Sequence, residues 1–405
     1  MEKFLLEILF EFFDRKTALK FSKRNLIPVP GKQHITSKQY ARDIQKPGLF
    51  NMISEQIDLV ITLAENNLPL DKFLELLLRL GQFSINTSEF TAAVYIYEKI
   101  LSKTKGKREL DSYTAFSYKS LADVFSRQAV WEISFGYIRR ASDIYEKENN
   151  YEGLADCENL AGTIYGDLGN LVKAQLHFEK AYSLITDKEV NKHLVSKIKM
   201  NLGIVNNIRG DIEKSLDFYK SALSDYKALN DVKRIAEMYH NLGMLYSKQG
   251  KFNNAHKEFD RSIKLSKKVG NLQTLGFSYI GKANIYAIQK EYYLGENFAE
   301  KALEVCHELN DLLSIADTYK IKGIIQRELG NFELSEQYLS TSLRLNKELK
   351  NQLNKAETEK ELGFLFKETG KSGDSKNYFR KAKRYFTLIG DKEESARIKA
   401  ILFSY

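Results

Sequence analysis

Residues that could do chemistry are few and widely separated in this chain of 405 residues. No metal-ligand spacing relates its six histidines, which are His34, His177, His193, His240, His256 and His307. The stretch HELND at 307–311 has Asp where a zinc-binding helix needs its second His. PGKQH at 30–34 has the Gly-Lys of a phosphate loop, but lacks the upstream glycine and the hydroxyl residue after the lysine. The sequence therefore predicts a protein that is not an enzyme, with no cofactor and no metal site.

The two cysteines, Cys157 and Cys306, are too few and too far apart for a disulfide framework. Both fall within predicted helices, where a lone cysteine is usually a small core residue. Their scarcity favours a reducing compartment, and no stretch reaches the length of apolar sequence that a membrane span needs. We therefore expect a cytoplasmic protein.

Proline and charge divide the chain into two parts. All four prolines lie in the first 69 residues, and a proline-free remainder rich in Leu, Lys, Glu and Ala predicts nearly continuous helix. The net charge is +9, and residues 15–46 hold nine Lys or Arg against one acid, Asp43, so this segment alone carries +8. An excess confined to one segment indicates a local arm or patch.

A repeat of about forty residues organises the rest of the chain. Its first marker is a small residue at Gly81, Ala122, Gly162, Gly203, Gly243, Ala283, Gly323 and Gly363. Seven residues later a second glycine recurs in most units, as at Gly210 and Gly250, where one apolar helical pattern stops and the next begins; Lys290 replaces it once. Glycine there suits a left-handed turn between two helices. The sequence therefore predicts eight helix pairs over residues 70–389.

The second helix of each pair combines a small residue with an aromatic at helical spacing, as in Ser215 with Tyr219 and Ala255 with Phe259. With Tyr239, Leu242, Gly243 and Tyr246, this pattern resembles the tetratricopeptide repeat. The period is longer than the common 34 residues, and is similar to that of kinesin light chain and of bacterial Rap-type regulators. The resemblance implies an all-α, right-handed superhelical solenoid that holds a protein or extended peptide on its concave face.

Helical geometry then selects candidate binding residues. A side chain two places before a marker glycine points about 200° away from the packed contact, which places Asn201 and Asn241 on the opposite side. The resemblance implies that this is the concave side, where asparagines and basic residues bind a peptide. The full predicted set is Lys119, Asp123, Asn159, Lys197, Asn201, His240, Asn241, Lys320 and Arg327.

The ends of the chain are expected to differ from the repeats. Residues 1–69 are predicted to form a helical N-terminal region, whose basic patch includes Arg15, Lys16, Lys20, Lys23 and Arg24. Three readings of segment 15–46 remain open: an arm for nucleic acid or an acidic protein, a helical module with solvated charges, or a segment ordered by a partner. Residues 390–405 are predicted to form a helix that caps the last repeat.

The sequence thus favours a non-enzymatic scaffold or adaptor that binds a protein or peptide partner in the concave groove. One alternative is a bacterial peptide-responsive receptor, in which a ligand changes the superhelix pitch. A second alternative is a nucleic-acid-associated factor that acts through its basic N-terminal segment.

Overall fold

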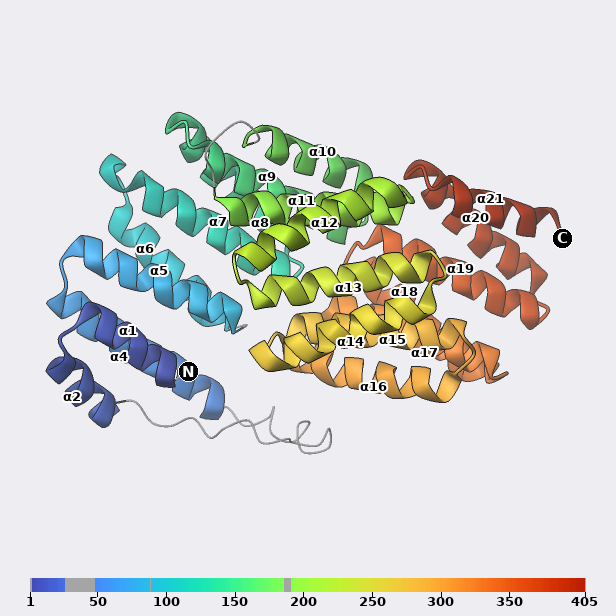
Figure 1. Cartoon of the computed structure of the whole chain (residues 1–405), viewed down its shortest axis with the longest axis horizontal. Helices are drawn as coiled ribbons and strands as arrows, with labels where there is room; N and C mark the ends of the chain where they lie inside the picture. The colour runs from blue at the N-terminus through green and yellow to red at the C-terminus, as the bar shows by residue number, and fades with distance from the viewer. Residues whose placement is uncertain (1, 26–47, 88, 186–190, 405) are drawn as a thin grey trace. The chain divides into compact units, whose positions relative to one another are not determined.

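The computed structural model describes residues 2–25, 48–87, 89–185 and 191–404. These residues form twenty α-helices and one short 3-10 helix, and no strand occurs among them (Figure 1). The helices pack in adjacent pairs along the chain, which confirms the predicted all-α solenoid of tetratricopeptide-like pairs. Within the described ranges, no helix is both long and apolar enough to cross a membrane.

The chain divides into two compact units, Met1–Asn149 and Asn150–Tyr405. The helices of unit 1 are α1 (Glu2–Phe12), α2 (Arg15–Asn25), α4 (Gly48–Asn67), α5 (Leu70–Asn86), α6 (Phe90–Thr104), η1 (Arg108–Leu110), α7 (Asp111–Arg127) and α8 (Trp131–Lys147). The helices of unit 2 are α9 (Tyr151–Asp167), α10 (Leu171–Ser183), α11 (Lys192–Arg209), α12 (Ile212–Ala228), α13 (Val232–Lys248), α14 (Phe252–Val269), α15 (Leu272–Ile288), α16 (Tyr292–Leu309), α17 (Leu312–Glu328), α18 (Phe332–Glu348), α19 (Gln352–Glu368), α20 (Ser372–Leu388) and α21 (Lys392–Phe403).

Each marker glycine lies where the two helices of a pair touch. A Cβ atom added to Gly203 would lie 2.5 Å from the ring of Tyr219, closer than real contacts allow, so only glycine lets the ring reach this helix. Tyr219 is 1% exposed and fills the interior of its pair. Ser215 is small enough for this packing, and its hydroxyl also donates a 2.8 Å hydrogen bond to the carbonyl of Gly203. The repeated glycine is therefore a packing residue.

The turns between paired helices explain the second marker. Gly210 and Gly250 have φ of 89° and 70°, in the left-handed region that glycine adopts without strain. Lys290 adopts the same region, with φ of 63°, so the exceptional repeat keeps the turn without the glycine. Because one residue in αL ends the first helix and redirects the chain, successive helices pack antiparallel.

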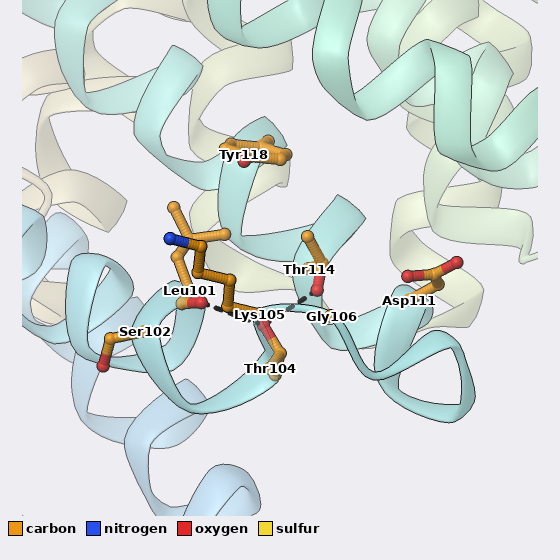
Figure 2. A pocket seen from close by; sticks show the side chains of 8 residues that line it. All are labelled: Leu101, Ser102, Thr104, Lys105, Gly106, Asp111, Thr114 and Tyr118. Atoms are coloured by element: carbon orange, nitrogen blue, oxygen red, sulfur yellow. Dashed lines mark hydrogen bonds between the residues drawn. The ribbon is translucent and has the colours of Figure 1, made fainter.

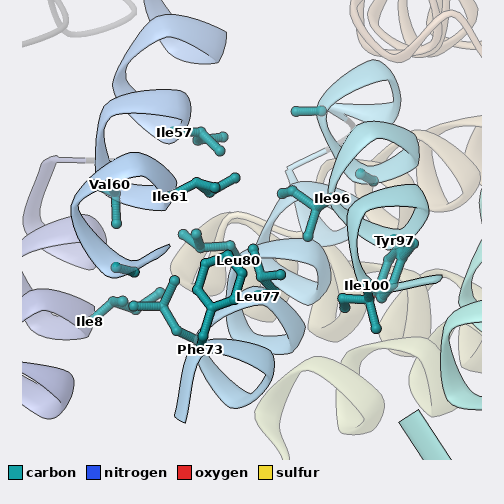
Figure 3. Packing of buried hydrophobic residues seen from close by; sticks show 14 of the residues in the cluster. Ile8, Ile57, Val60, Ile61, Phe73, Leu77, Leu80, Ile96, Tyr97 and Ile100 are labelled. Carbon is teal, nitrogen blue, oxygen red and sulfur yellow. The ribbon is translucent and has the colours of Figure 1, made fainter. Parts of the chain in front are cut away.

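Unit 1 has its own apolar core, in which the N-terminal helices join the first repeat pair. Figure 3 shows Ile8 of α1 beside Phe73 of α5, and Ile57 and Ile61 of α4 in the same apolar cluster, which also includes Leu77 of α5. These side chains are at most 3% exposed, so α1 and α4 bury their apolar faces against the repeat. The N-terminal helices are thus integral to the core of unit 1.

The described residues test only part of the three expectations about the ends of the chain. The basic segment begins in α2, while residues 26–47 lie outside the described residues. Helix α21 occupies the predicted cap, and Ile398 is fully buried beside Phe379 and Phe386. The proposed division at residues 69 and 389 stays a prediction.

Candidate functional site

The candidate site is built on the first helices of the repeat pairs in unit 2. Helices α9, α11, α13, α15, α17 and α19 contact one another in that order, while the second helix of each pair packs beside its own first helix. Positions three before, two before and four after a marker glycine lie within about 120° of one another around a first helix, so residues there share one side of successive first helices. We call Asn159, Asn201, Asn207 and Asn241 the asparagine face.

Asn159 and Asn201 join neighbouring repeats directly. The Nδ2 amide of Asn201 donates a 2.8 Å hydrogen bond to Oδ1 of Asn159. Asn159 is fully buried and Asn201 is 9% exposed, yet Nδ2 of Asn159 has no hydrogen-bond partner. A buried amide nitrogen without an acceptor is costly, at about 1–3 kcal/mol. This pair therefore keeps one unused donor.

The next amide along α11 keeps an unused acceptor. Asn207 is 8% exposed, and its Oδ1 atom has no hydrogen-bond partner. The ammonium of Lys248 instead bonds two backbone carbonyls beside it, those of Asn207 and Ile208, each at 2.9 Å. Asn241 on α13 is partly exposed. The asparagine face thus offers both donors and acceptors.

His240 is held in an apolar environment beside Asn241. Its ring centroid lies 5.5 Å from that of Phe259 and 5.9 Å from that of Phe277. Burial lowers the pKa of His240 to about 4, so the imidazole is neutral near pH 7. His240 consequently supplies no charge to a partner at neutral pH.

The predicted cations of unit 2 are engaged in ion pairs. Lys197 contacts Asp156 at 3.1 Å, and Lys320 contacts Asp317 at 2.6 Å and also Glu357. Burial opposes the charge of Lys320, but these two carboxylates outweigh it and raise the pKa of the ammonium above its ordinary value. Both lysines therefore stabilise neighbouring helices.

Arg327 is more deeply embedded. Only 8% of its side chain is exposed, and its guanidinium contacts Glu361 at 2.9 Å, Glu328 at 2.8 Å and Glu368 at 3.4 Å. Burial lowers its pKa, but the three carboxylates together raise it above the usual range. We interpret Arg327 as a link between α17 and α19.

The two predicted residues of unit 1 lie on α7. The ammonium of Lys119 lies 5.5 Å from the ring centroid of Phe116, and Asp123 accepts a 3.1 Å hydrogen bond from Arg127. These contacts are formed within one helix. The structure brings Asn159, Lys197 and Asn201 together in unit 2, whereas Lys119 and Asp123 belong to unit 1.

The basic patch partly coincides with α2. Arg15, Lys16, Lys20 and Lys23 are exposed, whereas Ala18 is buried and anchors the helix. The side chain of Arg24 lies outside the described residues. The four described cations therefore form a solvent-facing basic surface.

A cavity of about 420 Å³ occurs in unit 1 beside the turn between α6 and α7, and no predicted residue is among those that line it (Figure 2). Its lining includes Lys105, Asp111 and Tyr118, and Thr114 donates a 2.8 Å hydrogen bond to Thr104 there. Across the described residues, no group of three His, Cys, Asp or Glu could hold a metal ion.

Sequence reasoning missed Asn207, although the signal for it was present. Asn207 lies four residues after its marker, Gly203, as Arg327 lies four residues after Gly323. Arg327 was predicted from its spacing of seven residues from Lys320, but a search of the position four residues after each marker would have selected Asn207 as well. The pairing of Asn159 with Asn201, 42 residues apart, could be inferred only from the stacking of whole repeats.

Comparison with known proteins supports the repeat assignment. The tetratricopeptide-repeat family model matches residues 194–268. The chain is 25% identical over 158 residues to Protein KINESIN LIGHT CHAIN-RELATED 2 of Arabidopsis thaliana, a match that covers 38% of this chain and 24% of that protein. It is 26% identical over 128 residues to Regulatory protein RapF of Bacillus subtilis (strain 168), covering 31% of this chain and 33% of RapF. The matches thus span a third or less of these relatives.

Two solved structures share the fold over most of their length. A Rap protein complexed with Competence and Sporulation Factor superposes with a TM-score of 0.57 at 17% identity, covering 86% of this chain and 99% of that one. NprR in complex with its cognate peptide NprX superposes with a TM-score of 0.58 at 13% identity, covering 82% and 98%. At these identities the likeness shows the fold alone.

Proposed function

We propose that this protein, a solenoid of tetratricopeptide repeats similar to those of kinesin light chain-related and Rap proteins, binds an extended segment of a protein or peptide on its asparagine face. The observation that carries the proposal is the row of amides on neighbouring first helices, in which Asn241 is partly exposed and Nδ2 of Asn159 and Oδ1 of Asn207 are buried without a partner. An extended main chain presents alternating carbonyl and amide groups, which match one donor and one acceptor.

The surroundings of these amides support a main-chain ligand. The partly exposed Asn241 adds a further donor and acceptor, and the neutral His240 adds no charge that would select an ionic ligand. The two similar structures named above were solved with a factor and a cognate peptide bound, respectively. We therefore favour peptide binding over catalysis, in keeping with a non-enzymatic protein.

The test is a selection of random displayed peptides on the purified chain, followed by affinity measurement for one selected peptide. Replacement of Asn201 and Asn241 together by Ala should weaken binding about tenfold to a hundredfold, since each lost hydrogen bond leaves a buried partner unpaired. Asn253→Ala with Asn254→Ala, on the exposed start of α14, is the matched control. Equal affinities of the two double variants would refute the proposal.

Two outcomes of binding are distinguished by a second measurement. An adaptor holds its partner without changing its own fold, whereas a peptide-responsive receptor changes conformation when it is occupied. Backbone hydrogen exchange with and without the selected peptide separates these alternatives. Protection confined to α9, α11 and α13 supports an adaptor, and altered exchange at distant turns supports a receptor.

A nucleic-acid partner is a second proposal, favoured by the exposed cations of α2. Lys16→Glu, Lys20→Glu and Lys23→Glu together reverse this surface without touching the buried core of unit 1. If duplex DNA or RNA binds there, mobility-shift assays at low salt should show binding that these changes abolish, because phosphate contacts are strongest at low salt. Absence of binding by the unaltered chain would eliminate this partner.

A further inference from the structure

Unit 2 contacts itself across a separation of almost five repeats. The backbone amide of Gln352, at the start of α19, donates a 2.8 Å hydrogen bond to the carbonyl of Leu168, in the turn after α9. The hydroxyl of Tyr385 on α20 donates to the carbonyl of the next residue, Gly169. We call these residues, with Leu171 and Leu353, the closing contact; Figure 1 shows the turn between α9 and α10 beside the orange and red helices.

Gly169 differs from the other turn glycines in what surrounds it. A Cβ atom added there would lie 2.2 Å from the backbone nitrogen of Leu353. At Gly210, Gly250, Gly330 and Gly370, which also have positive φ, the same atom would meet nothing within 4 Å. The turn alone requires only the left-handed backbone, so at Gly169 the distant helix imposes a second requirement.

Leu171 supplies the apolar part of the closing contact. It is fully buried in a cluster with Ala356, Phe379 and Ile398 of the C-terminal helices. Phe332, at the equivalent first position of α18, is 37% exposed. Burial of Leu171 therefore depends on the distant helices, in addition to its own pair.

The closing contact involves few residues, and a carboxyl group with a raised pKa lies next to it in the chain. Two hydrogen bonds to carbonyls hold it, together with an apolar cluster in which Leu171 and Ile208 meet the C-terminal helices, whereas neighbouring repeats share whole helix faces. Asp167 comes directly before these residues in the chain. Burial, together with the nearby Asp311 at the N-terminus of α17, raises the pKa of the Asp167 carboxyl to about 7. A small contact next to a desolvated carboxyl is suited to local opening without loss of the repeats.

We propose that the closing contact is a releasable lock between successive turns of the repeat array, and that its opening admits a partner to the asparagine face. The first helices join α9 to α19 in sequence, and the contact returns the chain from α19 to α9. Release would separate these two ends and widen access to the face between them. The identity of the admitted partner rests on the proposed function, but the lock itself does not.

Hydrogen exchange tests the lock without any ligand. Gly169→Ala should speed exchange of the Gln352 amide, and Tyr385→Phe should speed it about threefold to tenfold, since it loses one hydrogen bond. Gly250→Ala is the matched control, because it carries the same positive-φ cost with open space around it. Exchange at Gln352 that is equal in Tyr385→Phe, Gly169→Ala and the control would overturn the lock.

Thiol labelling tests access, again without a peptide. Cys157 and Cys306 are buried, so Asn241→Cys introduces one accessible thiol on the asparagine face. Gly169→Ala in this background should accelerate reaction with a bulky polyethylene glycol maleimide about tenfold, if local opening limits the rate, and leave reaction with N-ethylmaleimide unchanged. Unchanged labelling by the bulky reagent would refute the gating role. A failed peptide selection would refute only the proposed function.

Discussion

The first helices of unit 2 show two chemistries at equivalent repeat positions. In the N-terminal half, Asn207 and Asn241 lie four residues after one marker glycine and two before the next. In the C-terminal half, Arg327 and Glu361 occupy the same two positions and form a 2.9 Å ion pair. The backbone geometry repeats, but the two positions hold amides in one half, with the acceptor of Asn207 unused, and an ion pair in the other.

This difference separates a binding surface from a structural one. A buried charge must be compensated within the protein, so Arg327 and Glu361 have little capacity left for a partner. A buried amide tolerates an unused donor or acceptor at a smaller cost. We infer that the asparagine half can form further hydrogen bonds with a bound partner, while the ion-pair half holds α17 and α19 together.

The largest expected effect is on the ion-pair half. Arg327→Ala leaves three carboxylates without their cation and should lower the unfolding free energy of unit 2 by about 3–5 kcal/mol. Urea denaturation followed by circular dichroism measures it. Arg344→Ala is the control, because Arg344 and Glu348 are 61% and 56% exposed and such pairs contribute about 0–1 kcal/mol. Equal losses of unfolding free energy in both variants would show that Arg327 does not have this structural role.

How much the sequence could predict depends on how far apart the interacting residues lie. The helix pairs were predictable because every repeat meets the same packing requirement, as Gly203 with Tyr219 illustrates. The engagement of Lys320 with Glu357 was not, since it depends on how one repeat stacks on the next. The contact of Tyr385 with Gly169, 216 residues apart, depends on the accumulated rotation of several repeats, which no local pattern encodes.

The second prediction replaces residues of the asparagine half of unit 2 by those found at the equivalent positions of the ion-pair half. Asn207→Arg with Asn241→Glu places the residues of the ion-pair half on the asparagine face. The exchange removes the unused acceptor of Asn207 and should weaken binding of a selected peptide about tenfold to a hundredfold, with no loss of thermal stability.

Titration calorimetry and a thermal melt measure the two effects. Asn253→Arg with Asn254→Glu, which adds the same cation and anion at exposed positions of α14, is the control for the added charges. Retained peptide affinity in the double variant would show that the unpaired amides are not the binding groups.

The smallest effect expected is on the pH dependence of the closing contact. Burial and Asp311 raise the pKa of Asp167 to about 7, so the closed form binds a proton that an open, solvated form would release. Closure is therefore favoured below this pKa and weakened as pH rises through it. For a carboxyl that returns to its ordinary pKa on opening, the closing equilibrium falls about tenfold between pH 6 and pH 8.

Protection of the Gln352 amide, corrected for intrinsic exchange at each pH, measures this equilibrium. Asp167→Asn should make it independent of pH, because an amide carries no ionisable proton. Asp217→Asn, on the exposed side of α12, should retain the pH dependence of the unaltered chain. A pH dependence that persists in Asp167→Asn would show that another group binds the proton and that Asp167 does not control the closing contact.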